Sequence, residues 1–271
     1  MGSAATRQPA IEEQEVPQPI ITPSKWLGRD ALSGDADGCS VAIVGFCRFG
    51  NMKDRLSAET LSERCFSHLD QRHQFIGQVD GKQVLALECL YGGPMAATVI
   101  EELAHYGITR VVGYGYAGSI SNTLRVGQVT VADSAIPSDG TSREYLPEAE
   151  IVRPVARSME ILTDCAAEAG IEVRSARVWT TDAIYREYPA KIERWKYAGA
   201  DVVNMDTGHF YAVSQVVGLS AIYACVISDD VSGSRWDDGF ARIQQGTRDM
   251  QGLVLNTARR MLLDDAAEMT A

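Results

Sequence analysis

Short apolar stretches alternate with longer amphipathic stretches along most of the chain. CSVAIVG (39–45) and LSAIYACVI (219–227) have the continuous apolar character of buried strands. GGPMAATVIEELAHYG, in contrast, repeats its apolar residues with helical spacing after Pro94, a residue that suits the first position of a helix. Strands that alternate with helices predict a single α/β domain with a twisted, mixed, mostly parallel central sheet flanked by helices.

The same patterns predict the other elements. Asp80-Gly81 lies between two apolar runs and predicts a hairpin over 75–89. Further strands are expected at 108–114, 127–133 and 173–179, helices near 154–169, 189–198 and 237–263, and a turn-rich loop at 137–147. In a sheet of this kind ligands bind at the carboxyl ends of the strands, so the polar residues there are the candidates for a site.

The composition of the chain limits the classes of ligand that it can bind. The 271 residues carry a net charge of −11, which argues against a nucleic acid and favours a small-molecule ligand. No apolar run is long enough to cross a membrane. The six cysteines lack a C-x-x-C pair and are expected to be reduced and structural. Residues 1–19 are rich in glutamate and proline, so we expect a flexible tail on a cytoplasmic protein, followed by a domain over 20–271.

A glycine motif in VGYGYAGS (112–119) matches the spacing G-x-G-x-x-G of dinucleotide-binding proteins. That fingerprint requires a helix directly after the glycines, so that the pyrophosphate meets the helix N-terminus. The residues that follow are SISNTLRVGQVTVAD, which contain turn residues and then a β-rich run. An acidic residue about 20 positions further on is also missing. The motif therefore does not predict a dinucleotide site, and its glycines need another explanation.

Three polar segments fall where strands are expected to end: TTDAIYRE (180–187), VVNMDTGHF (202–210) and ISDD (227–230). A carboxyl group at the end of a buried strand is partly desolvated, which favours its protonated form and suits a proton donor. Asp229 is the best candidate for that role. The structural alternatives are that Asp206 caps a helix and that SDD is an ordinary polar turn. The four histidines lack the spacing of metal ligands, so no metal site is predicted.

Six segments taken in order resemble the nucleoside phosphorylase and nucleosidase superfamily, which includes uridine phosphorylase and hexameric purine nucleoside phosphorylase. They are GGPMAATVIEEL, GYAGSI, VGQVTVADSAIPSDGTSREYLP, TTDAIYRE, VVNMDTGHFYAV and VISDD. The resemblance covers about 40–263. It implies an enzyme that cleaves the bond between the sugar and the base of a nucleoside, without a metal or organic cofactor, and that assembles as a homo-oligomer, from dimer to hexamer.

The resemblance also implies roles for single residues. NMD is similar to the family's Glu-Met-Glu, so Asp206 would grip the ribose hydroxyls and Met205 would pack under the sugar. A carboxylate there suits the positive charge that develops on the ribose. SDD is similar to Ser-Asp-His/Asn of purine enzymes, so Asp229 would protonate the leaving purine, assisted by Arg242 or Arg235. The residues implied at the base are Tyr185, Arg186 and Gly118, and a purine is favoured over uracil.

Phosphate binding is where the chain departs from the family. Gly45 and Arg48 would supply the first-loop contacts, but Gly113 occupies the position of a second arginine and Tyr116 replaces a threonine. Losing one charge-assisted donor costs about 1.5–3 kcal/mol, and Arg143 is the candidate to replace it. Phosphorolysis to free base and ribose 1-phosphate is the favoured activity. The alternatives are hydrolysis, for which GFCRFGN lacks the glutamate that activates water, and a non-catalytic nucleoside-binding or storage protein.

Overall fold

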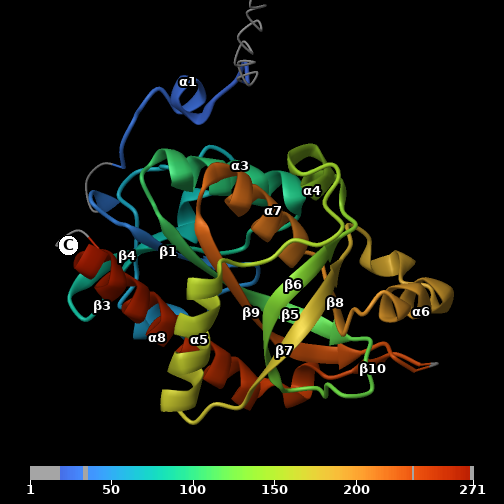
Figure 1. The fold of residues 1–271 in the computed structure, drawn as a ribbon. Coiled ribbons are helices and arrows are strands. Elements are labelled where there is room, and N and C mark those ends of the chain that lie inside the picture. The colour runs from blue at the N-terminus through green and yellow to red at the C-terminus, as the bar shows by residue number, and fades with distance from the viewer. Residues whose placement is uncertain (1–18, 33–35, 234, 269–271) are drawn as a thin grey trace, which may run out of the picture.

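A mixed β-sheet runs through the molecule and separates its helices into two layers (Figure 1). The computed structural model describes residues 19–32, 36–233 and 235–268, so the expected tail lies outside the described residues except for Pro19. The described strands are β1 Val41–Gly45, β2 Glu59–Thr60, β3 Gln74–Val79, β4 Lys82–Leu87, β5 Arg110–Ser119, β6 Val129–Pro137, β7 Val173–Thr180, β8 Val202–Asn204, β9 Ser220–Asp230 and β10 Asp237–Asp238.

The strand order is β10-β9-β6-β7-β8-β5-β1-β4-β3-β2, with a further pairing of β9 with β5. This pairing closes β5, β9, β6, β7 and β8 into a ring, from which the other strands extend. Within the described ranges, five of the ten pairings are parallel, so the mixed sheet is confirmed but antiparallel pairings are as frequent as parallel ones. The Asp80-Gly81 hairpin is also confirmed, with Val79 opposite Lys82.

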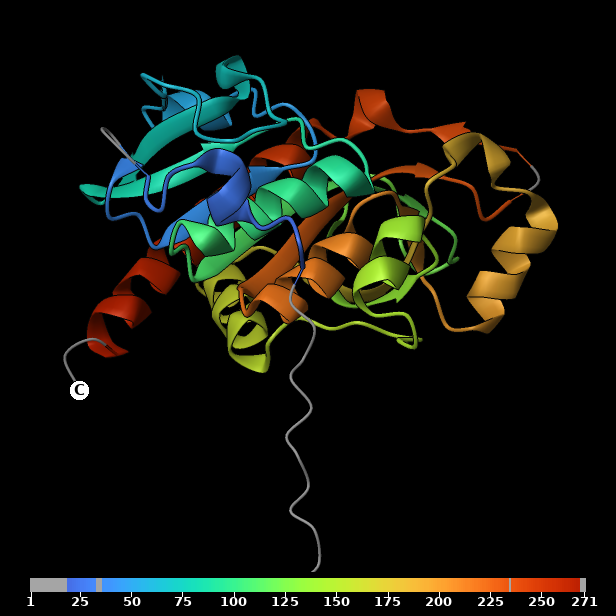
Figure 2. The same ribbon diagram turned by 90° about the horizontal axis from the view of Figure 1, so that it is seen from above.

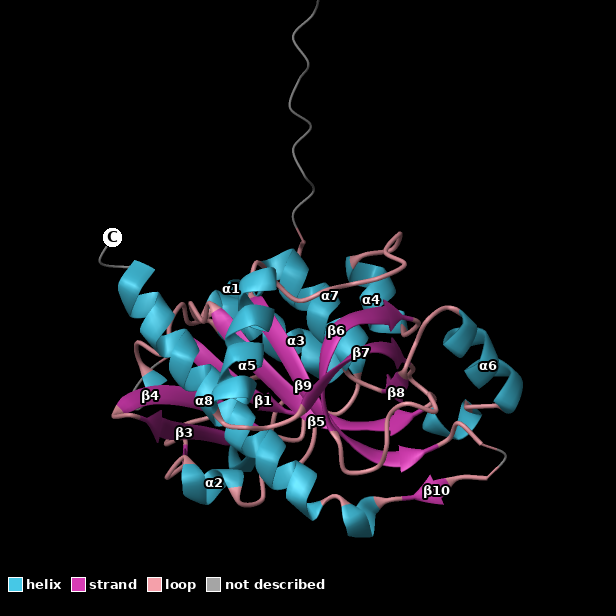
Figure 3. Ribbon diagram, turned by 60° about the horizontal axis from the view of Figure 1, so that its bottom comes forward, coloured by secondary structure: helices cyan, strands magenta, loops and turns pink. Residues whose placement is uncertain are grey.

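Two helical layers cover the sheet (Figure 2). Helices α3 (Gly93–His105) and α7 (Thr207–Val217) pack together on one face, with α4 (Gly140–Tyr145) beside them, and α5 (Ala156–Glu168) and α8 (Gln244–Glu268) pack on the other. Figure 3 shows α8 lying along the strands. The described helices are α1 Pro23–Leu27, α2 Met52–Arg55, α3 Gly93–His105, α4 Gly140–Tyr145, α5 Ala156–Glu168, α6 Pro189–Tyr197, α7 Thr207–Val217 and α8 Gln244–Glu268, with 3-10 turns η2 Gln71–His73, η3 Ile184–Arg186 and η4 Phe240–Arg242.

The structure corrects the expected boundaries in four places. The glycine motif lies inside strand β5, which continues to Ser119, and ISDD lies inside β9, which continues to Asp230. The expected loop at 137–147 contains α4, because Asp139 accepts a hydrogen bond from the Ser142 amide and caps a helix. The expected helix from Asp237 begins only at Gln244, because residues 237–238 pair with β9.

None of the helices in the described part of the chain combines the length and the apolar character needed to cross a membrane.

Candidate active site

Adjacent strands bring the candidate residues into one region of the sheet. Strand β5 lies between β1 and β9, with Gly45 opposite Tyr114 and Gly118 opposite Asp229. Gly118 also faces Val203 of β8, the strand that leads into α7 and Asp206. Segments far apart in the sequence therefore meet along β5.

Asp206 does not cap helix α7 with its side chain, although it occupies the cap position. Asn204 caps the helix instead, since its Oδ1 accepts hydrogen bonds from the amides of Asp206 and Thr207 at 3.1 and 3.2 Å. The Asp206 carboxyl is left to accept a hydrogen bond from the Tyr223 hydroxyl at 3.2 Å. The capping explanation for Asp206 therefore fails, and its carboxyl is available for a ligand.

Burial raises the pKa of Asp206 to about 7, against the opposing effects of His209 and of the Tyr223 hydroxyl. Burial and the neighbouring Asp206 also raise the pKa of the Cys47 thiol to about 12. Cys47 is therefore a neutral thiol at physiological pH, and the group of this pair that titrates near neutrality is Asp206.

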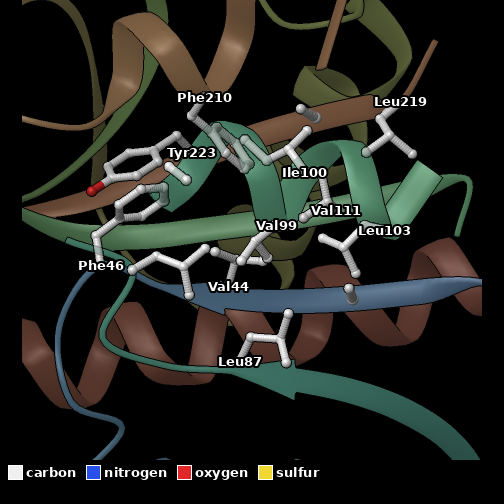
Figure 4. Close-up of a cluster of buried hydrophobic side chains, with 14 of the residues drawn as sticks. Val44, Phe46, Leu87, Val99, Ile100, Leu103, Val111, Phe210, Leu219 and Tyr223 are labelled. Carbon is white, nitrogen blue, oxygen red and sulfur yellow. The ribbon is translucent and has the colours of Figure 1, made fainter. Parts of the chain in front are cut away.

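Three aromatic rings explain why glycines are needed in β5. Phe46, Phe210 and Tyr223 pack against one another with ring centroids 5.6–5.8 Å apart (Figure 4). A Cβ at position 113 would lie 2.8 Å from the Tyr223 ring and 2.9 Å from Phe210. This packing has no room for an arginine at position 113, the position at which the resemblance implies a second phosphate ligand.

We expect Gly115→Ala to destabilise the protein by about 1–3 kcal/mol, the usual cost of overpacking. Its Cβ would overlap the Tyr223 hydroxyl, which is the group that donates to Asp206. Urea denaturation measures the change. The matched control is Gly233→Ala, whose Cβ would meet nothing closer than 3.9 Å, and equal stability of the two variants would contradict the steric explanation.

Asp229 is held by two donors at the end of β9. The Ser228 hydroxyl donates to its Oδ1 at 2.6 Å, and the Trp236 indole donates to its Oδ2 at 2.8 Å. A Cβ at Gly118 would lie 3.3 Å from the same carboxyl, so this glycine borders Asp229. The SDD segment is therefore part of strand β9, and the explanation of SDD as an ordinary polar turn is wrong.

Glu187 is a further acidic residue at this site that the sequence analysis did not select. It follows η3 and is partly buried, whereas the preceding Tyr185 and Arg186 are exposed. Burial and the nearby Asp229 carboxylate raise the pKa of Glu187 to about 7. The signal in the sequence was the acidic end of TTDAIYRE, but nothing in it shows that this residue turns inward while its neighbours do not.

The candidate arginines are more scattered. Arg242 is exposed and donates to the Asp237 carboxylate at 2.6 Å, so the structure does not bring it onto Asp229. Arg235 is exposed. Arg48 is exposed next to the Cys89 thiol in the loop after Gly45. Arg143 is exposed on α4 and forms no hydrogen bond or ion pair with another described residue.

Tyr116 lies on the β5 face that is directed toward α8, so it does not share the face of Gly113 and Gly115. Its ring packs edge-on against Phe240 at 6.0 Å, and burial raises the pKa of its hydroxyl. Met205 is partly buried between Asn204 and Asp206, at the strand-to-helix junction.

Potential metal ligands group at His73, Glu88 and Cys89, with ligand atoms within 4.8 Å of one another. The oxygens of Glu88 are already engaged by the Phe49 amide at 2.6 Å, His73 at 3.1 Å and Lys53 at 2.8 Å. A cation would have to displace the Lys53 ammonium, so this group is better explained as a buried ion-pair network.

A surface hollow of about 470 Å³ lies at the C-terminal end of α7, where it is lined by residues such as Arg153, Gln215 and Ser220. None of the candidate site residues lines it. This hollow is therefore not the candidate site, whose carboxyl group Asp206 lies at the N-terminal end of α7.

Comparison with known proteins identifies the family of the chain. Residues 40–259 match the model of the phosphorylase superfamily. An uncharacterized protein of Acanthamoeba polyphaga mimivirus is 33% identical over 221 residues, which cover 80% of this chain and 85% of the viral one. A DeoD-type purine nucleoside phosphorylase of Caldanaerobacter subterraneus is 24% identical over 66% of this chain and 79% of its own.

Solved structures share the fold at low sequence identity. Purine nucleoside phosphorylase from Toxoplasma gondii, in complex with immucillin-H, superposes with a TM-score of 0.71 at 21% identity and covers 82% of this chain and 91% of its own. The 5'-methylthioadenosine/S-adenosyl homocysteine nucleosidase of Campylobacter jejuni reaches 0.69 at 14% identity, over 82% of this chain and 100% of its own. The family match over most of the length and the shared fold lead to one conclusion: this chain belongs to the phosphorylase superfamily.

Proposed function

We propose that the chain cleaves the N-glycosidic bond of a purine-type nucleoside by phosphorolysis, giving free base and ribose 1-phosphate. The observation that carries the proposal is the position of the Asp206 carboxyl. Asn204 caps helix α7 in its place, and the Tyr223 hydroxyl holds the carboxyl next to the glycines of β5. A partly buried carboxyl without a structural task is costly, and such groups mark functional sites.

In this proposal two acidic residues do different work. Asp206, in its ionised form, accepts hydrogen bonds from ribose hydroxyls and stabilises the positive charge that develops on the sugar as the bond to the base breaks. Asp229 is fixed by Ser228 and Trp236 at the end of β9, where it donates a proton to the leaving base. A base that leaves in neutral form leaves more easily.

Arg48 and the Gly45 backbone are the proposed phosphate ligands, with Arg143 as the second cation. Hydrolysis remains the alternative activity, because the aromatic cluster closes position 113 to an arginine. It would require a carboxylate to activate water, and the nearby Glu88 is occupied by Lys53, His73 and the Phe49 amide. The engagement of Glu88 favours phosphorolysis.

Inorganic phosphate is then the co-substrate, and the proposal includes no metal or organic cofactor. We also propose that the protein is a cytoplasmic homo-oligomer. Exposed aromatic side chains near the site, Tyr185, Trp236 and Phe240, suit a contact between copies of the chain.

The direct test is to incubate the protein with adenine, guanine, hypoxanthine and uracil nucleosides, with and without phosphate, and to measure free base by chromatography. Release of a purine only with phosphate supports the proposal. Release without phosphate establishes hydrolysis, and binding without any release establishes a binding protein.

We expect Arg48→Gln to raise the KM for phosphate by about 10- to 150-fold, because it removes a charge-assisted hydrogen bond worth about 1.5–3 kcal/mol. Arg143→Gln should act in the same direction. The control is Arg153→Gln, an exposed arginine at the far end of α7. Initial rates at varied phosphate give the constants, and unchanged values for both site variants would contradict these phosphate ligands.

A further inference from the structure

Trp236 is an exposed tryptophan whose polar edge is bonded to the proposed proton donor. Its indole Nε1 donates to Asp229 Oδ2 at 2.8 Å, although the residue is 62% exposed. The mechanism above uses the Asp229 carboxyl but assigns no task to the large ring beside it. Tryptophan combines apolar ring faces with one polar N–H, and aromatic side chains commonly line ligand sites. The exposed ring is therefore a candidate contact for the ligand.

The hairpin of β9 and β10 fixes where this ring lies. Trp236 directly precedes β10, which pairs antiparallel with the end of β9. Just after β10, a Cβ at Gly239 would lie 2.4 Å from the carbonyl oxygen of Ser228, so the main chains of the two segments are in close contact there. The ring is held at the carboxyl end of β9 by this backbone pairing as well as by its own hydrogen bond.

The other tryptophans of the chain have partners for their rings. Trp179 and Trp195 stack on each other with centroids 5.8 Å apart, and Trp26 stacks on His68 at 6.1 Å. Of the four tryptophan rings, that of Trp236 alone lacks an aromatic or cationic partner among the residues that the structure describes. Its ring face is therefore available to a flat partner from outside the chain.

The Asp229 carboxyl has room for a ligand next to this ring. Gly118 presents no side chain there, and a Cβ at its position would lie 3.3 Å from Asp229 Oδ2. A carboxylate has about four acceptor positions, and the Ser228 hydroxyl and the Trp236 indole occupy two of them. The carboxyl can therefore exchange a proton with a ligand while the indole stays bonded to it.

We propose that Trp236 is a specificity-determining residue: its exposed ring stacks on the base of the nucleoside, and its N–H holds the Asp229 carboxyl at the edge of that base. A flat heterocycle with a nitrogen at its edge, such as a purine, satisfies both contacts. Stacking alone accepts any base, since every base has a π-face, so the nitrogen that meets Asp229 provides the selection. The inference rests on the proposed function, because it assigns a contact to the leaving base of the same site.

Kinetics of two variants separate the N–H from the ring. Trp236→Phe keeps an aromatic ring but removes the donor, so kcat should fall about 10-fold, the effect of losing one hydrogen bond to a charged group, while KM for the nucleoside changes little. Trp236→Ala also removes the ring, and KM should rise about 5- to 150-fold, the range that stacking on a base contributes. Trp26→Ala is the matched control, because Trp26 is 60% exposed on α1, which lies well apart from β10 (Figure 1).

An unchanged KM in Trp236→Ala would overturn the proposal. If that variant also formed a smaller assembly than the wild type in size-exclusion chromatography, the ring would belong to a contact between copies of the chain instead.

A second measurement uses the wild type and needs no turnover. The four indole N–H groups give separate signals in ¹H–¹⁵N spectra, and the signal missing from Trp236→Phe assigns Trp236. We expect added hypoxanthine or adenine, which carry no glycosidic bond to cleave, to shift this signal and to leave that of Trp26 in place. A Trp236 signal that stays in place while calorimetry shows the base to be bound contradicts the inference. Failure of the wild type to cleave any nucleoside instead contradicts the proposed function, and a shift of the Trp236 signal would still support the stacking contact.

Discussion

Replacing Asp229 by asparagine is expected to lower kcat by about 10²- to 10⁴-fold, the range that general acid catalysis contributes. The amide cannot give a proton to the leaving base, but it keeps the shape of the carboxyl group. It also still accepts a hydrogen bond from Ser228 or Trp236, the donors that position residue 229. The affinity for the nucleoside should therefore change little.

Asp230→Asn is the matched control for this variant. Asp230 is adjacent in the same strand, and its carboxylate accepts a hydrogen bond from the Ser232 amide at 2.7 Å, which an asparagine oxygen can also accept. Steady-state kinetics and calorimetric titration of the nucleoside separate the rate from binding. If Asp229→Asn retained the wild-type kcat, Asp229 would not be the proton donor, and Glu187 would become the candidate.

In the proposed mechanism, Glu187 is the acidic neighbour of the proton donor Asp229. The proximity of the two carboxyl groups disfavours a second negative charge, and burial together with Asp229 raises the pKa of Glu187 to about 7. Glu187 can therefore hold a proton near neutral pH beside Asp229, where the proposed mechanism requires a proton for the base.

Strong local patterns predicted the fold correctly. The Asp80-Gly81 turn and the apolar face of α3 each depend on residues that are close in the sequence. The lengths of β5 and β9 were underestimated because their ends are polar or rich in glycine, and partner strands stabilise them there. Pairing between distant segments is a tertiary effect that a local pattern does not contain.

Candidate residues could be selected from the sequence where they lie at or just after the end of a strand, as Asp229 and Asp206 do. The contacts of Asp139 with His209, and of Asp229 with Trp236, join residues that local sequence does not relate. The reason for Gly113 was equally hidden, because the rings that fill its space come from α7 and β9. The sequence pattern selected Asp206 and Asp229 but not Glu187, and packing determined which groups accompany these carboxyl groups.

Asp206→Asn should lower kcat/KM by about 10²- to 10³-fold, because the uncharged amide no longer stabilises the developing positive charge on the ribose. Wild-type activity should rise as the pH increases through about 7, where Asp206 loses its proton. The acidic limb of this profile should be absent from the variant. Kinetics between pH 5.5 and 9 test this on both proteins.

The same substitution should stabilise the free protein above pH 7. Burial raises the pKa of Asp206 from 3.8 to about 7, so the folded state holds the proton more tightly than the unfolded state. For an acid shifted in this direction, stability falls as the pH rises between the two values and stays low above the higher one. Asparagine carries no charge to desolvate, and the expected gain at pH 8 is roughly 1–3 kcal/mol after allowance for partial exposure and the Tyr223 hydrogen bond. Urea denaturation at pH 8 and at pH 5 measures the difference, which should shrink at the lower pH. If the Asp206 carboxylate had a structural role, Asp206→Asn would instead lose stability at pH 8. A variant that gains stability and loses activity indicates that the charge is retained for function.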